Sequence, residues 1–263
     1  MDLHRDELPA QAALVPARAG RGPVRVGLVL ALTIVALAWI PGTEAATASP
    51  RQDRMQQELR LALDPFSAAH HLYLEGLQAY EEEEYDKAYA ILKPLAQQGH
   101  TQAQFHLGTM YFHGRGIGRD SMAALVWYLA AADQGHTQAQ YNVGVAYAQG
   151  IGVDRDMRRA TVWWRKAALK GSTDAQFNLG LVYGKGYGVA RDAVAAARWW
   201  RMAALQGDPA AQFNLGMMYA RGDGVDRNWE QALDWWRKAA RQGFSHAIKA
   251  LKSARRDEYA SAR

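Results

Sequence analysis

The chain repeats one 36-residue segment four times without an insertion between copies. The copies run from His100 to Gly135, from His136 to Gly171, from Ser172 to Gly207 and from Asp208 to Gly243. A fixed period of this length with helical patterning inside each unit is typical of a solenoid, in which every unit packs against its neighbours. The repeats therefore predict a stacked array of small units, and the rest of the chain leads into this array or closes it.

Each copy carries the signals of two helices joined by a turn. In the last copy Asp208 can cap a helix, and the following proline fits the first helical position. The stretch Gly222–Gly224 interrupts the helix because glycine adopts positive φ without penalty. Asn228 can cap a second helix, which Gly243 ends. Each unit is thus expected to be a helical hairpin, with a first helix A and a second helix B, which makes the fold class all-α.

Glycines and large rings recur in register inside the predicted hairpins. Helix A carries a central glycine in every copy, at Gly108, Gly144, Gly180 and Gly216. A glycine inside a helix costs about 1 kcal/mol relative to alanine, so its repetition indicates that helix B crosses there at close range. Helix B carries a tryptophan in every copy, at Trp127, Trp163, Trp199 and Trp235. These four rings are predicted to lie in the core, each stabilising the fold by about 3 kcal/mol or more.

A second tryptophan follows the first in three copies, at Trp164, Trp200 and Trp236. Adjacent helical residues point about 100° apart, so the two rings cannot occupy one side of the helix. The second ring is expected to pack against the next repeat. The alternative is that these rings stack on the sugars of a cell-wall ligand.

Residues Thr101 to Gly243 carry the pattern A-Q-F-N-L-G-x-M-Y-x-x-G-x-G-V followed by A-x-x-W-W-R-K-A-A-x-Q-G. This pattern resembles the Sel1-like repeat (SLR) family, a relative of the tetratricopeptide repeat (TPR). The resemblance implies an α/α solenoid, a right-handed superhelix of hairpins that serves as a protein-interaction scaffold, generally without catalysis of its own. On this basis the chain is expected not to be an enzyme and to need no cofactor.

The segments on either side of the array are predicted to close its ends, because the outer face of a terminal repeat has no neighbour. Residues 64–99 form a shorter, TPR-like hairpin that lacks the A-Q-F block, the glycine loop and the tryptophan pair, and this hairpin is expected to be the N-terminal cap. Residues 244–263 supply a C-terminal capping helix over Phe244–Ala254 and a tail expected to fray. Residues 49–63 are a linker or one short helix.

Residues 1–48 read as a targeting segment. Arg18, Arg21 and Arg25 lie just before the apolar run Val26–Ile40. The run is followed by a Pro-Gly breaker and by Ala46-Thr47-Ala48, the A-x-A pattern of a secretory signal peptide. An uncleaved signal anchor is the alternative. The run of 15 residues is shorter than the ~20 that a spanning helix needs, which favours cleavage, whereas the long polar leader opposes it. Either form places the repeats outside the cytoplasm, in the periplasm of a Gram-negative host, either released or anchored to the inner membrane.

The residue types needed for chemistry do not come together in the sequence. Cysteine is absent, which excludes disulfides, thiolate metal sites and cysteine nucleophiles. The glycine loops Gly114–Gly118 and Gly184–Gly188 look like phosphate cradles, but a nucleotide loop follows a strand, whereas these join two helices. His106 and His113 lie seven residues apart without a metal-binding motif, and His100 and His136 read as loop residues. We therefore expect no catalytic site and no metal.

One row of polar residues is the candidate partner-binding site. It occupies a single position of helix A, at His106, Asn142, Asn178 and Asn214. In superhelices similar to this one the A helices line the concave face, and asparagines at a comparable place in TPR proteins bind peptide termini. The alternative is that each side chain bonds locally to the neighbouring hairpin and shapes the superhelix. Gln104, Gln140, Gln176 and Gln212 carry the same two alternatives, with local bonding favoured.

The charge pattern adds a candidate outer surface. The chain carries a formal net charge of +5. Many basic residues fall on helix B, at Arg158, Arg159, Arg165, Lys166, Arg198, Arg201, Arg237, Lys238 and Arg241. Such a face would attract anionic wall polymer or lipid headgroups, although solubility explains it equally well.

The sequence thus predicts a non-catalytic exported scaffold that binds a protein or peptide partner in its concave groove and organises or regulates a cell-envelope complex. The alternative is a module that binds peptidoglycan or another polysaccharide. Nucleic acid is not expected as a partner, and the membrane is expected to be contacted only through an uncleaved N-terminal segment.

Overall fold

The computed structural model describes residues 65–261, which form helices and no strand, so the predicted all-α solenoid is confirmed. The first hairpin consists of α2 (Pro65–Glu81) and α3 (Tyr85–Gln97). The A helices of the four repeats are α4 (Thr101–His113), α6 (Thr137–Gln149), α8 (Thr173–Lys185) and α10 (Pro209–Arg221). Their B helices are α5 (Ser121–Asp133), α7 (Met157–Leu169), α9 (Ala193–Leu205) and α11 (Trp229–Arg241), and α12 (Ser245–Ser261) closes the chain. The predicted targeting segment 1–48 and the linker 49–63 lie outside the described residues.

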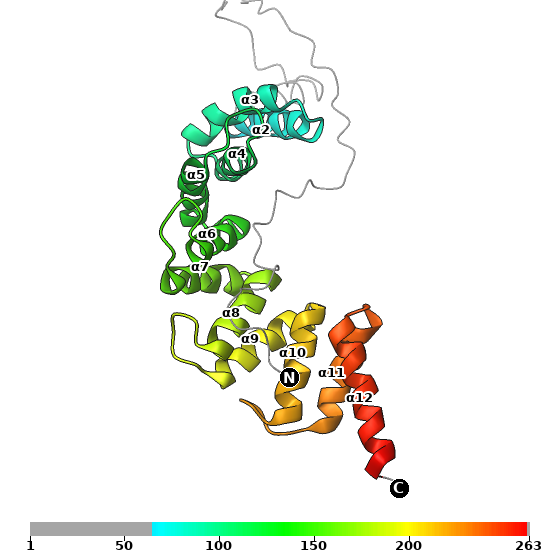
Figure 1. Cartoon of the computed structure of the whole chain (residues 1–263). Helices are drawn as coiled ribbons and strands as arrows, with labels where there is room; N and C mark the ends of the chain where they lie inside the picture. The colour runs from blue at the N-terminus through cyan, green and yellow to red at the C-terminus, as the bar shows by residue number, and fades with distance from the viewer. Residues whose placement is uncertain (1–64, 262–263) are drawn as a thin grey trace, which may run out of the picture.

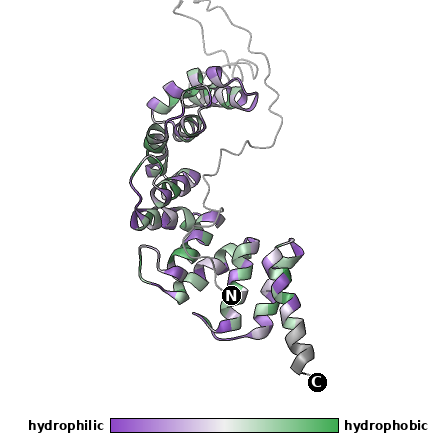
Figure 2. Ribbon diagram, viewed as in Figure 1, coloured by the Kyte–Doolittle hydropathy of each residue, from purple (hydrophilic) through white to green (hydrophobic). Residues whose placement is uncertain are grey.

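The hairpins follow one another along an arc, with the α2–α3 hairpin at one end and α12 at the other (Figure 1). Within the described residues, the substantial helix–helix contacts join helices that are consecutive in the chain. Apolar residues are spread over the whole array (Figure 2), and they form four buried clusters that succeed one another from α2 to α12. The fold is therefore stabilised hairpin by hairpin, as expected of a solenoid.

The helix caps lie where the sequence predicts them. At the start of each B helix an aspartate or asparagine side chain accepts a hydrogen bond from a backbone N–H, at Asp120, Asp156, Asp192 and Asn228. The A helices α8 and α10 are capped by Ser172 and Asp208. His100 and His136, expected to be plain loop residues, cap α4 and α6. Their Nδ1 atoms accept from the N–H groups of Ala103 and Ala139 at 3.2 and 3.1 Å.

Inside each hairpin the central glycine of helix A contacts the second ring of helix B, not the first. A Cβ atom added to Gly144 would lie 2.4 Å from the Trp164 indole, so no other residue leaves room for that ring. The equivalent buried rings in the other repeats are Tyr128, Trp200 and Trp236. The glycine therefore allows the two helices to approach until the ring fills the space between them.

This contact corrects the predicted role of the paired rings. Trp127, Trp163 and Trp199 are half-buried instead of forming the core, although Trp235 is buried as predicted. The second ring of each pair lies on the central glycine of its own hairpin, a contact that the sequence interpretation assigned to the first ring. The physical reason is helical phase: the ring four residues after a buried alanine shares its face, as Trp164 does with Ala160, and the preceding residue points about 100° away.

A second glycine in each repeat holds one hairpin against the one before it. Gly152, in the loop between α6 and α7, has φ +69°, and an added Cβ would lie 2.4 Å from the carbonyl oxygen of Ser121 at the start of α5. The same close approach occurs at Gly116, Gly188 and Gly224. Each A–B loop thus rests on the first turn of the preceding B helix. These contacts confirm that the glycine loops are turns between helices.

Glutamine side chains form a second link between hairpins. In every repeat the Nε2 atom of the helix A glutamine donates to a carbonyl oxygen eight residues earlier, at the end of the preceding hairpin. The donors are Gln104, Gln140, Gln176 and Gln212, and the acceptors are Ala96, Ala132, Ala168 and Ala204, at 3.0–3.1 Å. The local-bonding alternative therefore holds for the glutamine row.

The two ends of the array are built differently from its middle. In the first hairpin Leu92 takes the place of the large ring, and a Cβ added to Gly76 would lie 2.8 Å from it. At the other end α12 runs from Ser245 to Ser261 and is longer than the predicted helix Phe244–Ala254.

We expect Trp164→Ala to lower the free energy of unfolding by about 3–5 kcal/mol, because it opens a cavity between α6 and α7. The matched variant Trp163→Ala removes a half-buried ring one residue away and is expected to cost about 1–2 kcal/mol. Urea unfolding followed by circular dichroism measures both. Equal losses for the two variants would contradict the glycine–ring contact.

Gly152→Ala should destabilise the chain by about 2–4 kcal/mol, because alanine is strained at positive φ and its Cβ meets the Ser121 carbonyl. Gly171 also has positive φ, +92°, but an added Cβ there meets nothing within 4 Å. Gly171→Ala is therefore the control, with an expected cost of about 1 kcal/mol from backbone strain alone. Thermal unfolding of both variants would reveal a difference, and its absence would show that the loop contact does not hold the hairpins together.

Candidate interaction surface

The predicted polar row lies at equivalent places on the four A helices, but most of it is buried. The side chains of His106, Asn142 and Asn178 are 5%, 0% and 1% exposed, and Asn214 is half-buried. The A helices are enclosed by both neighbouring hairpins, and α6 is buried without a break from Ala139 to Ala148. Partner binding at these four positions stays a prediction, and the burial of three of them argues against direct contact with a partner.

Two members of the polar row, His106 and Asn142, make contacts with their own or a neighbouring hairpin. The His106 ring lies among Tyr73, Tyr80 and Phe105, with ring centroids 5.8, 5.9 and 5.5 Å away. Burial raises the pKa of Tyr128, and hydrogen bonds to Thr109 and Asn142 oppose that rise. These contacts favour the alternative in which the row shapes the packing of one hairpin on the next.

Burial also controls the charge of the histidines in the first repeats. It lowers the pKa of His106 to about 4, and His136 nearby adds to the effect. Burial lowers the pKa of His136 to about 4 as well, with a further contribution from Lys170. His136 accepts its capping hydrogen bond through Nδ1, which requires a neutral ring with no proton on this nitrogen. The His136 ring also stacks on the Phe105 ring, with the two ring centroids 4.3 Å apart.

Most of the large apolar side chains that are exposed in the described residues belong to the B helices. Seven apolar side chains of α5, α7 and α9 are 40–71% exposed: Met122, Val126, Val162, Leu169, Val194, Met202 and Leu205. All nine basic residues that the sequence assigns to the outer face of helix B are exposed too. The sequence interpretation missed the apolar part of this surface, although its signal is present: these residues recur at spacings of three, four, seven or eight along each helix, outside the positions of the buried alanines. We call this combined set the B-helix surface.

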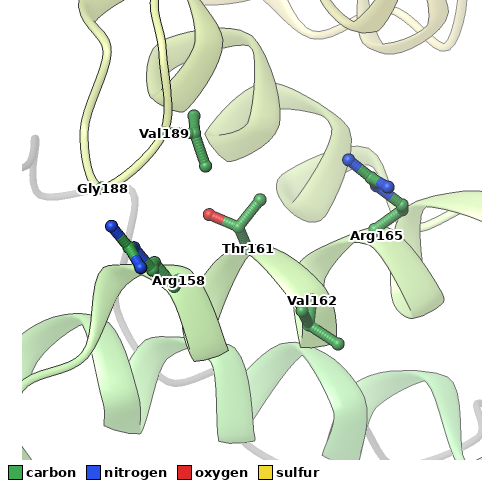
Figure 3. A pocket seen from close by; sticks show the side chains of 6 residues that line it. All are labelled: Arg158, Thr161, Val162, Arg165, Gly188 and Val189. Atoms are coloured by element: carbon green, nitrogen blue, oxygen red, sulfur yellow. The ribbon is translucent and has the colours of Figure 1, made fainter.

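One depression of about 400 Å³ interrupts the B-helix surface, between α7 and the loop that joins α8 to α9. Figure 3 shows Val189 of this loop pointing toward Thr161 of α7, with Arg158 and Arg165 on either side. Gly188 and Val162 complete its lining. The depression therefore combines an apolar floor with two cationic edges.

Two tryptophan rings next to this surface, Trp163 and Trp235, are covered by cations. Lys166 lies over the Trp163 ring at 3.8 Å, and Lys238 lies over Trp235 at 4.0 Å. Arg165 donates to the Tyr183 hydroxyl, and Arg201 donates to that of Tyr219 at 2.7 Å. Each arginine joins a B helix to the next A helix. One face of the Trp163 ring and one face of the Trp235 ring are thus already occupied, which does not fit a row of sugar-stacking platforms.

The residues that the structure describes show no arrangement suited to metal binding. Among them, no three His, Asp or Glu side chains come together as metal ligands would.

No helix of the described part is both long and apolar enough to span a bilayer. The glycine loops lie between helices and are closed by backbone hydrogen bonds. One example is the bond that the backbone N–H of Asp192 donates to the carbonyl oxygen of Tyr183 at 2.9 Å.

The Sel1 repeat family model matches residues 60–100, 101–136, 137–172, 173–208 and 209–244. The chain belongs to the Sel1 repeat family. The first match covers the α2–α3 hairpin, which is therefore a divergent repeat of the same family, and the predicted resemblance is confirmed.

Two solved structures show the same repeats in longer proteins. A Sel1 repeat protein from Oxalobacter formigenes is 39% identical with a TM-score of 0.60, over 65% of this chain and 49% of its own. The protective antigen c5321 of uropathogenic Escherichia coli, which has an SLR fold, is 34% identical with a TM-score of 0.67, over 73% of this chain and 42% of its own. The chain thus spans about half of these relatives or less. No curated protein matches it.

Sel1 repeat proteins generally mediate protein–protein interactions, and their solenoid is typically a non-catalytic scaffold. Family membership therefore supports a protein partner for this chain at this general level. It leaves the partner and its binding surface to be inferred from the chain's own residues.

We expect the stability of the chain to fall as the pH is lowered from about 6.5 toward 4, in part because of His106. The pKa of this ring is lower in the folded chain than its ordinary value of 6.5, so the unfolded chain binds the proton first. Its contribution is fully present above pH 6.5 and decreases by about 2 kcal/mol at pH 5.

The variant His106→Asn tests this dependence, because asparagine occupies the same position in the other three repeats. Its unfolding free energy, measured by urea titration at pH 7 and pH 5, should fall less than that of the parent chain. His71→Asn, at an exposed position, is the control and should behave like the parent. Equal pH dependence in all three chains would contradict the burial of a neutral His106.

Proposed function

We propose that this Sel1 repeat chain is a non-catalytic exported scaffold that binds a protein partner and organises or regulates a complex of the cell envelope. The observation that carries the proposal is the exposure of seven apolar side chains on three consecutive B helices. Apolar side chains gathered on the surface of a soluble protein mark sites of interaction. The exposed arginines and lysines among them add a preference for an acidic partner.

The B-helix surface is the part of the array that supports partner contact best. In the polar row of the A helices only Asn214 is more than slightly exposed. A partner lying along the concave groove would therefore meet few of the polar side chains that the sequence singled out. On α5, α7 and α9, by contrast, apolar anchors and flanking charges are already solvent-exposed, which is the composition of a typical protein interface.

Export is supported by the sequence of residues 1–48. A basic flank, a short apolar run and an A-x-A pattern occur in the order of a secretory signal. Sequencing the N-terminus of the mature protein and fractionating the host cells test this part. A start just after Ala48 identifies a cleaved signal, and an intact N-terminus in the membrane fraction identifies an anchor. Recovery of the repeats from the cytoplasm would overturn export.

A second candidate function is binding to an anionic cell-wall polymer, which the nine exposed basic residues of the B helices favour. The cations that cover Trp163 and Trp235 count against stacking of sugars on those rings. Binding of this kind would rest on charge and would weaken steeply with salt. Co-sedimentation with purified peptidoglycan at low and high ionic strength measures it directly.

Photo-crosslinking in whole host cells tests the protein partner. A photoreactive amino acid placed at Val162 or Met202 on the B helices should give adducts of discrete mass with a protein. The same group at Asn214 on the A-helix side should not. Adducts from Asn214 alone would show that the partner binds in the concave groove and not on the B-helix surface. Retention on peptidoglycan without any protein adduct would favour the second candidate function.

A further inference from the structure

We propose that the depression between α7 and the α8–α9 loop binds an acidic segment of the partner protein. Two carboxylates would pair with Arg158 and Arg165, and an apolar side chain between them would lie on Thr161, Val162 and Val189. This inference rests on the proposed function, since it takes the partner to be a protein.

The shape of the depression follows from the way that two hairpins meet. Gly188 rests on α7, where an added Cβ would lie 2.5 Å from the Cβ atom of Met157. This close approach brings Val189 toward Thr161 (Figure 3). The hydroxyl of Thr161 donates to the Met157 carbonyl oxygen at 2.7 Å, so the hydrogen-bonding group is used within the helix. The floor therefore offers mainly methyl groups, which suit an apolar side chain.

The two arginines lie at a fixed spacing along α7. Seven residues correspond to two helical turns, so their Cα atoms are about 10 Å apart on one face of the helix. Arg165 is held at the rim by its hydrogen bond to the Tyr183 hydroxyl. A helical partner with carboxylates seven residues apart and a leucine midway would match both the charges and the floor.

Neither arginine has a carboxylate partner within the part of the chain that the structure describes. Other exposed arginines of the array do: Arg159 pairs with Asp156, and Arg237 pairs with Asp234. Arg191 likewise pairs with Asp223 at 2.6 Å. The cations beside the depression are thus available to an acidic partner without the loss of an existing ion pair.

The other junctions of the array lack this arrangement. The positions equivalent to Arg158 and Arg165 are Met122 and Leu129 on α5, and Val194 and Arg201 on α9. In the first hairpin they are Asp86 and Lys93. Two arginines beside one apolar floor therefore occur at a single junction of the described repeats, which gives the array a defined place for an acidic segment.

Binding is measured by fluorescence anisotropy with the full-length chain. The probe is a labelled, alanine-based helical peptide that carries two glutamates seven residues apart and a leucine midway between them. Reversing both charges, by Arg158→Glu with Arg165→Glu, should lower the affinity of the chain for the probe by about tenfold. The control is Arg198→Glu with Arg237→Glu, which changes the net charge of the chain by the same amount but on other B helices. It should lower the affinity for the probe by only about twofold.

A probe with lysines in place of its glutamates should bind the Arg158→Glu, Arg165→Glu chain about as well as the original probe binds the parent. Circular dichroism establishes that each variant is folded. Equal losses in the two double variants would reduce the effect to general electrostatics and overturn the proposal, as would failure of the probe to bind the parent. If crosslinks from Val162 to a protein persisted in that case, the proposed function would stand without this inference.

A second copy of the chain is the competing occupant, because its exposed run Glu81–Glu84 is also acidic. Sedimentation velocity of the parent chain distinguishes it. Self-association that is lost on reversing Arg158 and Arg165 would show that the depression serves the chain itself and would contradict a foreign partner. A monomer that binds the probe supports the proposal.

Discussion

The contact between a glycine and a large ring determines the geometry of each of the four 36-residue repeats. Gly144 has no side chain, so the indole of Trp164 lies directly on the backbone of α6 and is completely buried. The same pairing recurs in the other repeats, with Tyr128 as the ring in the first of them. A glycine in a helix costs about 1 kcal/mol, whereas a buried tryptophan stabilises by several times as much, so the pairing is favourable on balance.

Stacking then depends on contacts that a single hairpin cannot make. Loop glycines such as Gly152 fit against the preceding B helix, and glutamines such as Gln140 bond to the carbonyl groups at its end. These links enclose the A helices between two neighbours. The consequence for function is that the A helices have few side chains left for a partner, while the B helices keep one face in solvent.

Much of this could be predicted from the sequence, because period, helix caps and turn glycines are local signals. Asp156 and Gly150 mark helix ends whatever lies around them. The sequence did not show which ring of a pair contacts the central glycine, because this depends on whether helix B turns the face of Ala160 and Trp164, or the face of Trp163, toward helix A. The burial of Asn142 depends in the same way on how tightly the hairpins stack, which no single repeat encodes.

Removal of repeats tests most directly whether each hairpin is stabilised by its own ring contact and by its neighbours. Chains that keep α12 but lack one, two or three of the 36-residue units should stay folded, and their free energy of unfolding should fall stepwise with each unit removed. That result would show that each hairpin is stabilised by its own glycine–ring contact and by its neighbours. Unfolding of the whole chain on loss of a single unit, or no change in stability on loss of two, would contradict it.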